Sequence, residues 1–193
     1  MTKEPKFLVD FMLGRLAKWL RIFGYDARYM EPPSRSAKIK IAGSDTGRHP
    51  AFNKVIVPGF EDGGTREKNN VSPVLESLKE NRILLTRNSR LSEKRAWKLV
   101  HIKSDRLEEQ LKQLVQEFGI NISRARLFTR CTVCNSPIER VSDKNEVRQA
   151  VPEYVFSTQD NFSKCVKCGK IYWQGTHWDL LLKKLESAGI KIR

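Results

Sequence analysis

The sequence predicts an α/β fold in which helices cover both faces of a mainly parallel sheet, with a small C-terminal lobe organised by cysteines. Short apolar runs of strand length alternate with segments whose apolar residues recur at helical spacing, a pattern typical of parallel sheets joined by helical crossovers. All four cysteines occur late in the chain, as two Cys-x-x-Cys pairs. The 193 residues are enough for one good-sized domain and a small appendage.

The first strand and helix are predicted within residues 6–26. Residues 7–9 form an apolar run too short for a helix, and from Leu13 the apolar residues follow a helical period. We expect Gly24 to end this helix as a left-handed cap. One acid, Asp10, stands between the strand and the helix. An acid at the carboxyl end of a parallel strand suits a phosphate-containing substrate, whereas the structural alternative is that Asp10 only caps the helix.

Three cations recur at every third position of this helix: Arg15, Lys18 and Arg21. We interpret them as a basic stripe able to contact the phosphates of RNA. The alternative is that they form an ordinary solvated surface.

The remaining elements of the sheet follow the same alternation. Further strands are predicted at residues 27–30, 82–86 and 98–102, and helices at 73–81 and 106–118. The alternation of strand and helix implies a mainly parallel sheet covered on both faces.

Polar residues follow three of the predicted strands: Asp10, Asn88 and Asp105. Because the carboxyl ends of parallel strands meet at one edge of a sheet, these residues are expected to converge on one site. Arg87 and Arg90 flank the asparagine and are candidates for binding RNA. For the last acid the alternative is a capping box with the glutamate three positions later.

Residues 31–70 interrupt this pattern as a basic insertion. The segment is rich in proline, glycine, serine and cations, and is too long for an ordinary loop. It contains two short β-prone runs, at 39–43 and 54–58, which could form a hairpin. The two interpretations are a disordered tail and an arm that contacts RNA.

The cysteine pairs carry the strongest chemical signal in the chain. Thirty residues separate the pairs, and an asparagine and a glycine follow them, at 135 and 169, as residue types that readily adopt the left-handed conformation of a zinc knuckle. Four thiolates enclose Zn²⁺ tetrahedrally and leave no open position, so the zinc is expected to be structural. Without a secretion signal, two disulfides or a redox pair are the weaker alternative. The expected zinc ligands are Cys131, Cys134, Cys165 and Cys168.

The sequence divides into a main domain at residues 1–125 and a zinc-ribbon lobe with a C-terminal helix at 126–193. Within the lobe, residues 151–156 are predicted to be a strand of the ribbon. Aromatic residues gather at 171–178. Those at 172 and 173 are expected to pack the ribbon onto the main domain, with stacking on unpaired bases as the alternative. Trp178 is a candidate for stacking on unpaired bases of RNA.

The charge favours a polyanionic partner. Lys and Arg number 36 against 22 Asp and Glu, which gives a net charge of +14 and a pI near 9.8. RNA or DNA is therefore expected ahead of a membrane surface. The sequence has no apolar stretch long enough to span a membrane and no signal-peptide pattern, so we expect an intracellular protein of the cytoplasm or an organelle matrix, without a membrane partner.

Two combinations of motifs resemble one known family. The first joins FLVDFMLGRLAKWLRIFGYD to RILLTRN, and the second joins LFTRCTVCNSPIERV to CVKCGKIYWQGTH. Together they resemble the PIN-like ribonuclease domain with an attached zinc ribbon found at the C-terminus of the Mut-seven exonucleases and in free-standing prokaryotic proteins. The resemblance covers about residues 6–30 and 70–180. It implies a PIN-like fold whose acids hold Mg²⁺ or Mn²⁺ for phosphodiester hydrolysis.

The acid set implied by this resemblance is incomplete. Asp10 and Asp105 match acids of the family, but Asn88 stands in place of the acid of the LLTRD motif. Another acid is expected near position 70 or 72, where the chain has Asn70 and Ser72. An amide brings no negative charge to a doubly charged ion, so the site is expected to bind metal weakly.

Two functions follow from these residues. The first is a non-cleaving RNA-binding protein on a ribonuclease fold, a candidate component of a ribosome or another ribonucleoprotein particle. The alternative is an active Mg²⁺- or Mn²⁺-dependent ribonuclease that cleaves single-stranded RNA, with Arg15, Lys18 and Arg87 positioning the phosphate. In the alternative, an acid of the insertion such as Asp62 or Glu67 completes the metal site.

Overall fold

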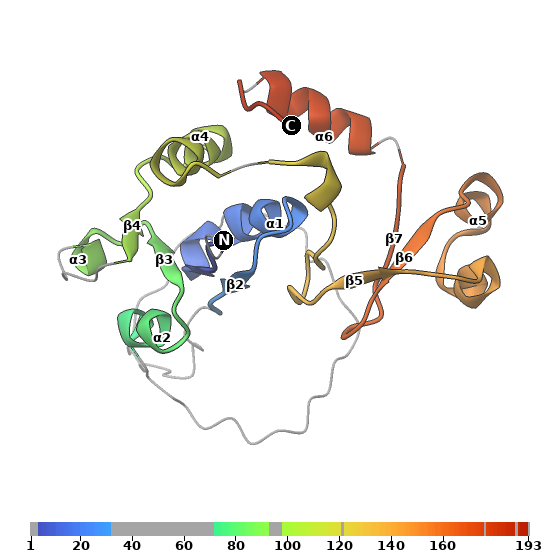
Figure 1. Cartoon of the computed structure of the whole chain (residues 1–193), viewed down its shortest axis with the longest axis horizontal. Helices are drawn as coiled ribbons and strands as arrows, with labels where there is room; N and C mark the ends of the chain where they lie inside the picture. The colour runs from blue at the N-terminus through green and yellow to red at the C-terminus, as the bar shows by residue number, and fades with distance from the viewer. Residues whose placement is uncertain are drawn as a thin grey trace, which may run out of the picture. The chain divides into compact units, whose positions relative to one another are not determined.

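The computed structural model describes residues 4–31, 72–92, 98–120, 122–175, 177–187 and 189–192, all within one compact unit. The predicted insertion and its β-prone runs lie outside these residues, apart from position 31. The elements, most of them labelled in Figure 1, are β1 (Phe7–Val9), η1 (Phe11–Leu13), α1 (Gly14–Ile22), β2 (Ala27–Tyr29), α2 (Pro73–Lys79), β3 (Ile83–Thr86), α3 (Ser89–Ser92), β4 (Leu99–His101), α4 (Leu107–Phe118), η2 (Arg124–Arg126), β5 (Ile138–Arg140), η3 (Lys144–Ala150), α5 (Glu153–Thr158), β6 (Phe162–Cys165), β7 (Ile171–Trp173) and α6 (His177–Ser187).

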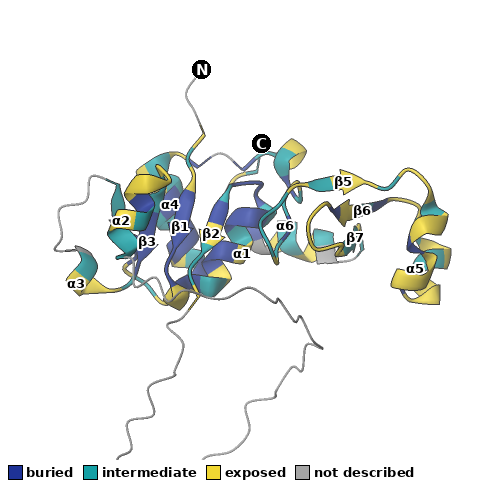
Figure 2. Ribbon diagram, turned by 90° about the horizontal axis from the view of Figure 1, so that it is seen from below, coloured by how far each residue is buried: buried dark blue, intermediate teal, exposed yellow. Residues whose placement is uncertain are grey.

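The predicted α/β fold is confirmed by a four-stranded parallel sheet in the order β2-β1-β3-β4. The two inner strands, β1 and β3, are the most apolar, as expected for strands that are covered on both faces. Figure 2 shows both of them largely buried. All four strands run in one direction, so their carboxyl ends lie at the same edge.

Side chains alternate between the two faces of this sheet. Phe7 and Val9 of β1 and Leu85 of β3 belong to a core that they share with helices α1, α4 and α6. Leu8 and Leu84 occupy the intervening positions and therefore point to the opposite face, where they are also fully buried. Helix α2 contacts β3. None of the described helices is long and apolar enough to cross a membrane.

The C-terminal helix, predicted as part of the zinc lobe, shares the core of the parallel sheet. Leu185 of α6 and Ile190 just beyond it are buried in that core. Ile192 also forms an isolated parallel bridge with Ile122. The end of the chain therefore stabilises the sheet after the ribbon has been completed.

The ribbon is a three-stranded antiparallel sheet in the order β5-β6-β7. The strand predicted at residues 151–156 is wrong, because this segment leads into helix α5. Strand β6 already has a partner on each side, and Pro152 is the N-cap of the helix, followed by Glu153 in its first turn. Two adjacent apolar residues of the segment, Val155 and Phe156, pack on the small core of the ribbon.

Gly24 ends α1 in the left-handed conformation that the sequence predicts, with φ of +82°. A Cβ atom at this position would lie 2.6 Å from the carbonyl oxygen of Arg126 and 2.8 Å from Oγ1 of Thr129. Both the backbone angle and the close approach of the segment before the ribbon therefore require glycine.

Candidate functional site

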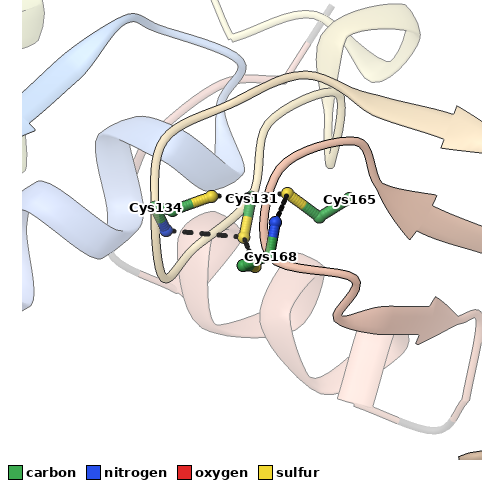
Figure 3. A group of neighbouring side chains, drawn as sticks. All are labelled: Cys131, Cys134, Cys165 and Cys168. Atoms are coloured by element: carbon green, nitrogen blue, oxygen red, sulfur yellow. Dashed lines mark hydrogen bonds between the residues drawn. The ribbon is translucent and has the colours of Figure 1, made fainter. Parts of the chain in front are cut away.

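The four cysteines form one cluster between the turns of the ribbon (Figure 3). Their Sγ atoms all lie within 4.8 Å of one another. The closest pairs are Cys134 with Cys165, at 3.3 Å, and Cys131 with Cys168, at 3.5 Å. Tetrahedral Zn–S bonds of about 2.3 Å place sulfurs about 3.8 Å apart, so the cluster fits one Zn²⁺ ion with four thiolate ligands.

Each cysteine pair adopts the expected knuckle conformation. Asn135 has φ of +66° and Gly169 has φ of +70°, as predicted for the residue after each pair. The backbone N–H groups of Cys134 and Cys168 donate to the sulfur of the first cysteine of their own pair, each at 3.5 Å. These bonds orient the first sulfur of each pair toward the centre of the cluster.

Burial and hydrogen bonds shift the pKa values of two thiols of the cluster in opposite directions. Burial opposes ionisation of Cys134, but hydrogen bonds from the backbone and side chain of Ser136 outweigh it and lower the pKa of this thiol to about 6. Burial and bonds with the neighbouring sulfurs raise the pKa of Cys168 to about 12. Because zinc binds thiolates, binding must release the proton of Cys168.

Arg21, a candidate for RNA contact, is engaged within the protein, and its contact with RNA stays a prediction. Its side chain is only 6% exposed. The guanidinium donates to the carbonyl oxygen of Ala27 at 2.8 Å, and to those of Thr132 and Val133 in the first knuckle at 2.9 Å each. Burial lowers the pKa of Arg21, while the charges of Cys131 and Cys134 oppose this effect. Arg21 therefore joins α1 to the first knuckle.

The geometry of α1 explains why Arg21 does not lie on the same face of the helix as Arg15. Successive residues of an α-helix are about 100° apart, so positions spaced by three drift by about 60° at each step. Arg21 therefore lies about 120° from Arg15 around the axis. Arg15 and Lys18 are exposed, as the basic stripe predicted.

A pocket of about 630 Å³ lies beside these two cations. Its charged lining includes Arg15 and Lys18 of α1, Arg87 after β3, and Asp105 ahead of α4. These four side chains form no ion pair with another described residue. The structure therefore brings these four predicted site residues, together with the buried Arg21, into the lining of one cationic pocket.

The wall of the pocket also includes residues that the sequence did not single out. Tyr29 of β2 and two residues of the first zinc knuckle, Thr132 and Val133, line it. The carbonyl groups of both knuckle residues are the acceptors for Arg21. No local pattern marks them, because they reach the pocket only through this long-range contact.

Asp10 is placed differently from Asp105. It is 5% exposed, and its Oδ2 accepts a hydrogen bond of 2.5 Å from Oγ1 of Thr86. Its side chain makes no capping bond to the following helical turn, so the capping alternative is wrong. The same Thr86 oxygen accepts from the N–H of Asn88 at 3.0 Å. The ends of β1 and β3 are thus connected, as the parallel topology predicts.

Asn88 and Asp105, the other two residues at strand ends, have different surroundings. Oδ1 of Asn88 accepts from the N–H of Arg90 at 3.1 Å, so this amide holds the start of α3. The capping box predicted as an alternative for Asp105 is wrong, because the N-cap of α4 is Arg106, whose N–H donates to Oγ of Ser104. Asp105 is exposed in the pocket.

The strand-end acids, the basic pocket and the cysteine cluster can now be compared with known families. The chain matches the Mut7-C RNAse domain over residues 5–48 and 58–185. It belongs to this family. Comparisons with curated proteins and with solved structures find no match. The family resemblance stated for the sequence is thereby confirmed across both the parallel sheet and the zinc ribbon.

The described residues at the sheet edge of this Mut7-C domain do not include a group of three or more His, Cys, Asp or Glu side chains close enough to share one metal ion. Among them, the four cysteines make up the group of three or more potential ligands that could hold a metal. Asp10 is engaged by Thr86, and Asn88 contributes an amide where the resemblance implied an acid. Asp62 and Glu67 lie outside the described residues.

The two remaining candidates for RNA contact lie outside the pocket lining. Arg90 is exposed on α3. Trp178 of α6 is half-buried against the core and stacks on Phe128, with ring centroids 4.7 Å apart. Tyr172 packs within the ribbon as predicted, because its hydroxyl lies 3.1 Å from Sγ of Cys131 and accepts the N–H of Thr132.

Proposed function

We propose that this Mut7-C domain binds RNA through the cationic pocket and has a sheet edge too poor in carboxylates for efficient cleavage. The observation that carries the proposal is the gathering of Arg15, Lys18 and Arg87 around one pocket without an ion pair to another described residue. One carboxylate, Asp105, accompanies them. A pocket with this charge suits a phosphate of the RNA backbone.

Each cation has a distinct part in this binding. Guanidinium groups can donate two parallel hydrogen bonds to a phosphate, so Arg15 and Arg87 would fix its orientation. Lys18 adds a point charge on the same helix as Arg15. Phosphate contacts fix the position of a strand without reading its bases, so binding should be strongly salt-dependent and only weakly sequence-dependent.

Weak cleavage is supported by the partners of the strand-end residues. A hard cation such as Mg²⁺ takes oxygen ligands, preferably charged ones. Here the oxygen of Asn88 caps α3 and carries no charge, and Asp10 is held by Thr86. The basic pocket does not depend on these residues for its charge.

The binding step is tested by changing Arg15, Lys18 and Arg87 together to alanine. Affinity for a single-stranded RNA, measured by fluorescence anisotropy over a range of salt concentrations, should fall. The slope of log K against log salt should flatten by about 0.7 for each phosphate contact that is lost. The control replaces three cations elsewhere, Lys79, Lys112 and Lys191, and should keep the slope. Equal slopes for the two triple variants would contradict the proposal.

The cleavage step is tested by Asn88→Asp. This change restores a negative charge at nearly constant shape and should tighten Mn²⁺ binding, measured by calorimetry. The wild type should show little cleavage of single-stranded RNA in Mg²⁺ or Mn²⁺. Robust Mn²⁺-dependent cleavage that is abolished by Asp10→Asn would contradict the proposal and assign an active ribonuclease.

A binding role without cleavage also suits a component of a ribosome or another ribonucleoprotein particle. The net charge of +14 supports a polyanionic partner of this kind. Sedimentation of cell extracts should place the protein with ribosomal or other ribonucleoprotein particles. Its recovery in RNA-free fractions alone would contradict this part of the proposal.

A further inference from the structure

A second pocket, of about 260 Å³, lies between the ribbon and the C-terminal helix. Its lining combines aromatic rings with small polar side chains, and consists of Leu127, Phe128, Asn161, Ser163, Tyr172, Trp173, Gln174, Gly175 and Trp178. The residues come from β6, β7, the start of α6 and the segment ahead of the first knuckle. This pocket has none of the acids or free cations of the first one in its lining.

The aromatic part of the pocket leaves one large ring available to a ligand. Trp173, in the edge strand β7, is 40% exposed. Trp178 and Phe128 stack on each other at 4.7 Å and contribute to the same pocket. Exposed aromatic rings beside a hollow are the usual platforms for unpaired bases, because every base has a flat π-face.

Phe128 is held in an unusual backbone conformation at this place. Its φ is +57°, a left-handed value that is uncommon for a bulky residue. Its N–H donates to the carbonyl oxygen of Ile22 at 2.8 Å, so the end of α1 fixes this conformation. The result is a ring that stacks on Trp178 at the pocket.

The polar part of the pocket suits the edge of a base and its phosphate. The side chains of Asn161, Ser163 and Gln174 supply hydrogen-bond donors and acceptors. Arg140 donates to Oδ1 of Asn161 at 2.6 Å, which places a positive charge beside the lining. Lys170 lies over the ring of Tyr172, with its Nζ 5.7 Å from the ring centroid. Two cations next to an aromatic hollow favour a nucleotide over an uncharged ligand.

We propose that this aromatic pocket binds one unpaired base of an RNA strand, with Trp173 as the stacking platform. The inference rests on the proposed function, to which it adds a contact with a base that is separate from the phosphate contacts of the cationic pocket. It also assigns a role in RNA binding to Trp178, whose ring closes the pocket against Phe128.

The experiment compares a short single-stranded RNA with an abasic strand of the same length and charge. Zinc-loaded full-length protein should bind the intact strand more tightly. Trp173→Ala should weaken binding of the intact strand by roughly 5- to 150-fold, the range of one base stacked on an aromatic side chain. Binding of the abasic strand should hardly change. The slope of affinity against salt should also stay constant, because no phosphate contact is removed.

Two variants serve as controls. Tyr154→Ala removes an aromatic side chain of α5 that is 78% exposed and does not line the pocket, and it should leave both affinities unchanged. Trp173→Phe should retain most of the preference for the intact strand. The zinc content of each variant shows whether its ribbon is folded. The comparison of intact and abasic strands is made on the wild type and needs no variant.

The outcomes separate this inference from the proposed function. Equal affinity of the wild type for intact and abasic strands, with a salt slope that still depends on Arg15, would overturn the base pocket alone. The pocket would then be better suited to an apolar segment of a protein. Absence of any RNA binding by the wild type would overturn the proposed function as well.

Discussion

The parallel sheet and the zinc ribbon of this Mut7-C domain differ in what stabilises them. The sheet has a continuous core built from its strands and from helices α1, α4 and α6. The buried cluster of the ribbon contains Val147, Val151 and Phe162, with a few half-buried neighbours. Figure 2 shows the same difference, with the inner strands of the parallel sheet buried and α5 largely exposed.

Burial of apolar side chains is enough to stabilise the parallel sheet but not the ribbon. Buried apolar area contributes roughly 25 cal/mol per Å², and a small cluster supplies too little to offset the entropy lost on ordering the ribbon. Four thiolates around one ion can supply the difference. The two parts are connected by polar contacts. Arg21 donates to the carbonyl oxygens of Thr132 and Val133, and Oδ1 of Asn135 accepts from the N–H of Ala27.

The largest effect should follow from loss of the metal. Cys168→Ser should unfold the ribbon and leave the parallel sheet folded, because zinc binding in isolated fingers is worth on the order of 10–16 kcal/mol. Hydrogen exchange would show amides of β5 to β7 losing protection while those of β1 and β3 keep theirs. The wild type should contain one zinc per chain by elemental analysis. Less than half an equivalent would contradict this account.

A cavity in the core of the parallel sheet should destabilise the sheet and leave the zinc ribbon intact. Leu16 of α1 is fully buried, and Leu16→Ala should lower the free energy of unfolding of the sheet by about 2–5 kcal/mol. Zinc content should stay at one equivalent. Urea unfolding followed by circular dichroism measures the loss, and Leu180→Ala, at a largely exposed position of α6, is the matched control. An equal loss for both variants would show that the core does not stabilise the sheet as described.

The contact between the parallel sheet and the ribbon can be tested by comparing substitutions of Arg21 and Arg15, which both lie in α1. Arg21→Met should lower the free energy of unfolding by about 1–3 kcal/mol, because it removes the donor to the buried carbonyl group of Ala27 and to the part-buried carbonyl groups of the first knuckle. Arg15→Met should leave stability nearly unchanged and instead weaken RNA binding. Unfolding and RNA titration of both variants test this pair, and reversed effects would contradict it.

The smallest effect concerns Asp26, which joins the sheet to the first knuckle. Its carboxylate accepts two bonds from Arg82, at 2.7 and 3.2 Å, and one from Nδ2 of Asn135 at 2.7 Å. Burial alone would raise the pKa of Asp26, but these bonds outweigh it and lower the pKa below its usual value. The carboxylate therefore stabilises the fold at pH values above the unfolded pKa, near 4.

This contribution should disappear as the pH falls through the lowered pKa of folded Asp26. Asp26→Asn should cost about 1 kcal/mol at pH 7, and the difference from the wild type should shrink below about pH 4. Urea unfolding at several pH values measures both. A difference that stays constant down to pH 3 would show that the charge of Asp26 does not contribute.

The elements that the sequence predicts well are those set by neighbouring residues. The period of apolar residues identifies strands and helices of the parallel sheet, because burial of a strand on two faces and of a helix on one face imposes those spacings. The spacing of the cysteines identifies the zinc ligands in the same way, because two sulfurs on one tight turn can reach one ion. The left-handed residues Gly24, Asn135 and Gly169 follow from the backbone of such turns.

The elements that the sequence predicts poorly depend on partners far away in the chain. Residues 151–156 have the composition of a strand, but Pro152 caps helix α5 here, and Val155 and Phe156 pack from the helix on the small core of the ribbon. Arg15 and Arg21 are alike in sequence, and only the position of the knuckle, more than a hundred residues later, makes one exposed and the other buried.

The sequence by itself therefore determined the α/β class, the four cysteines of the cluster that could bind zinc and the cations that line the pocket, because each depends on local spacing or on the order of strands. The tertiary structure decided which of these residues meet. Thr86 holds Asp10, the first knuckle completes the wall of the cationic pocket, and Phe128 brings its ring against Trp178. Such contacts join residues that are distant in the chain, and no local pattern encodes them because they arise only when the separate elements pack together.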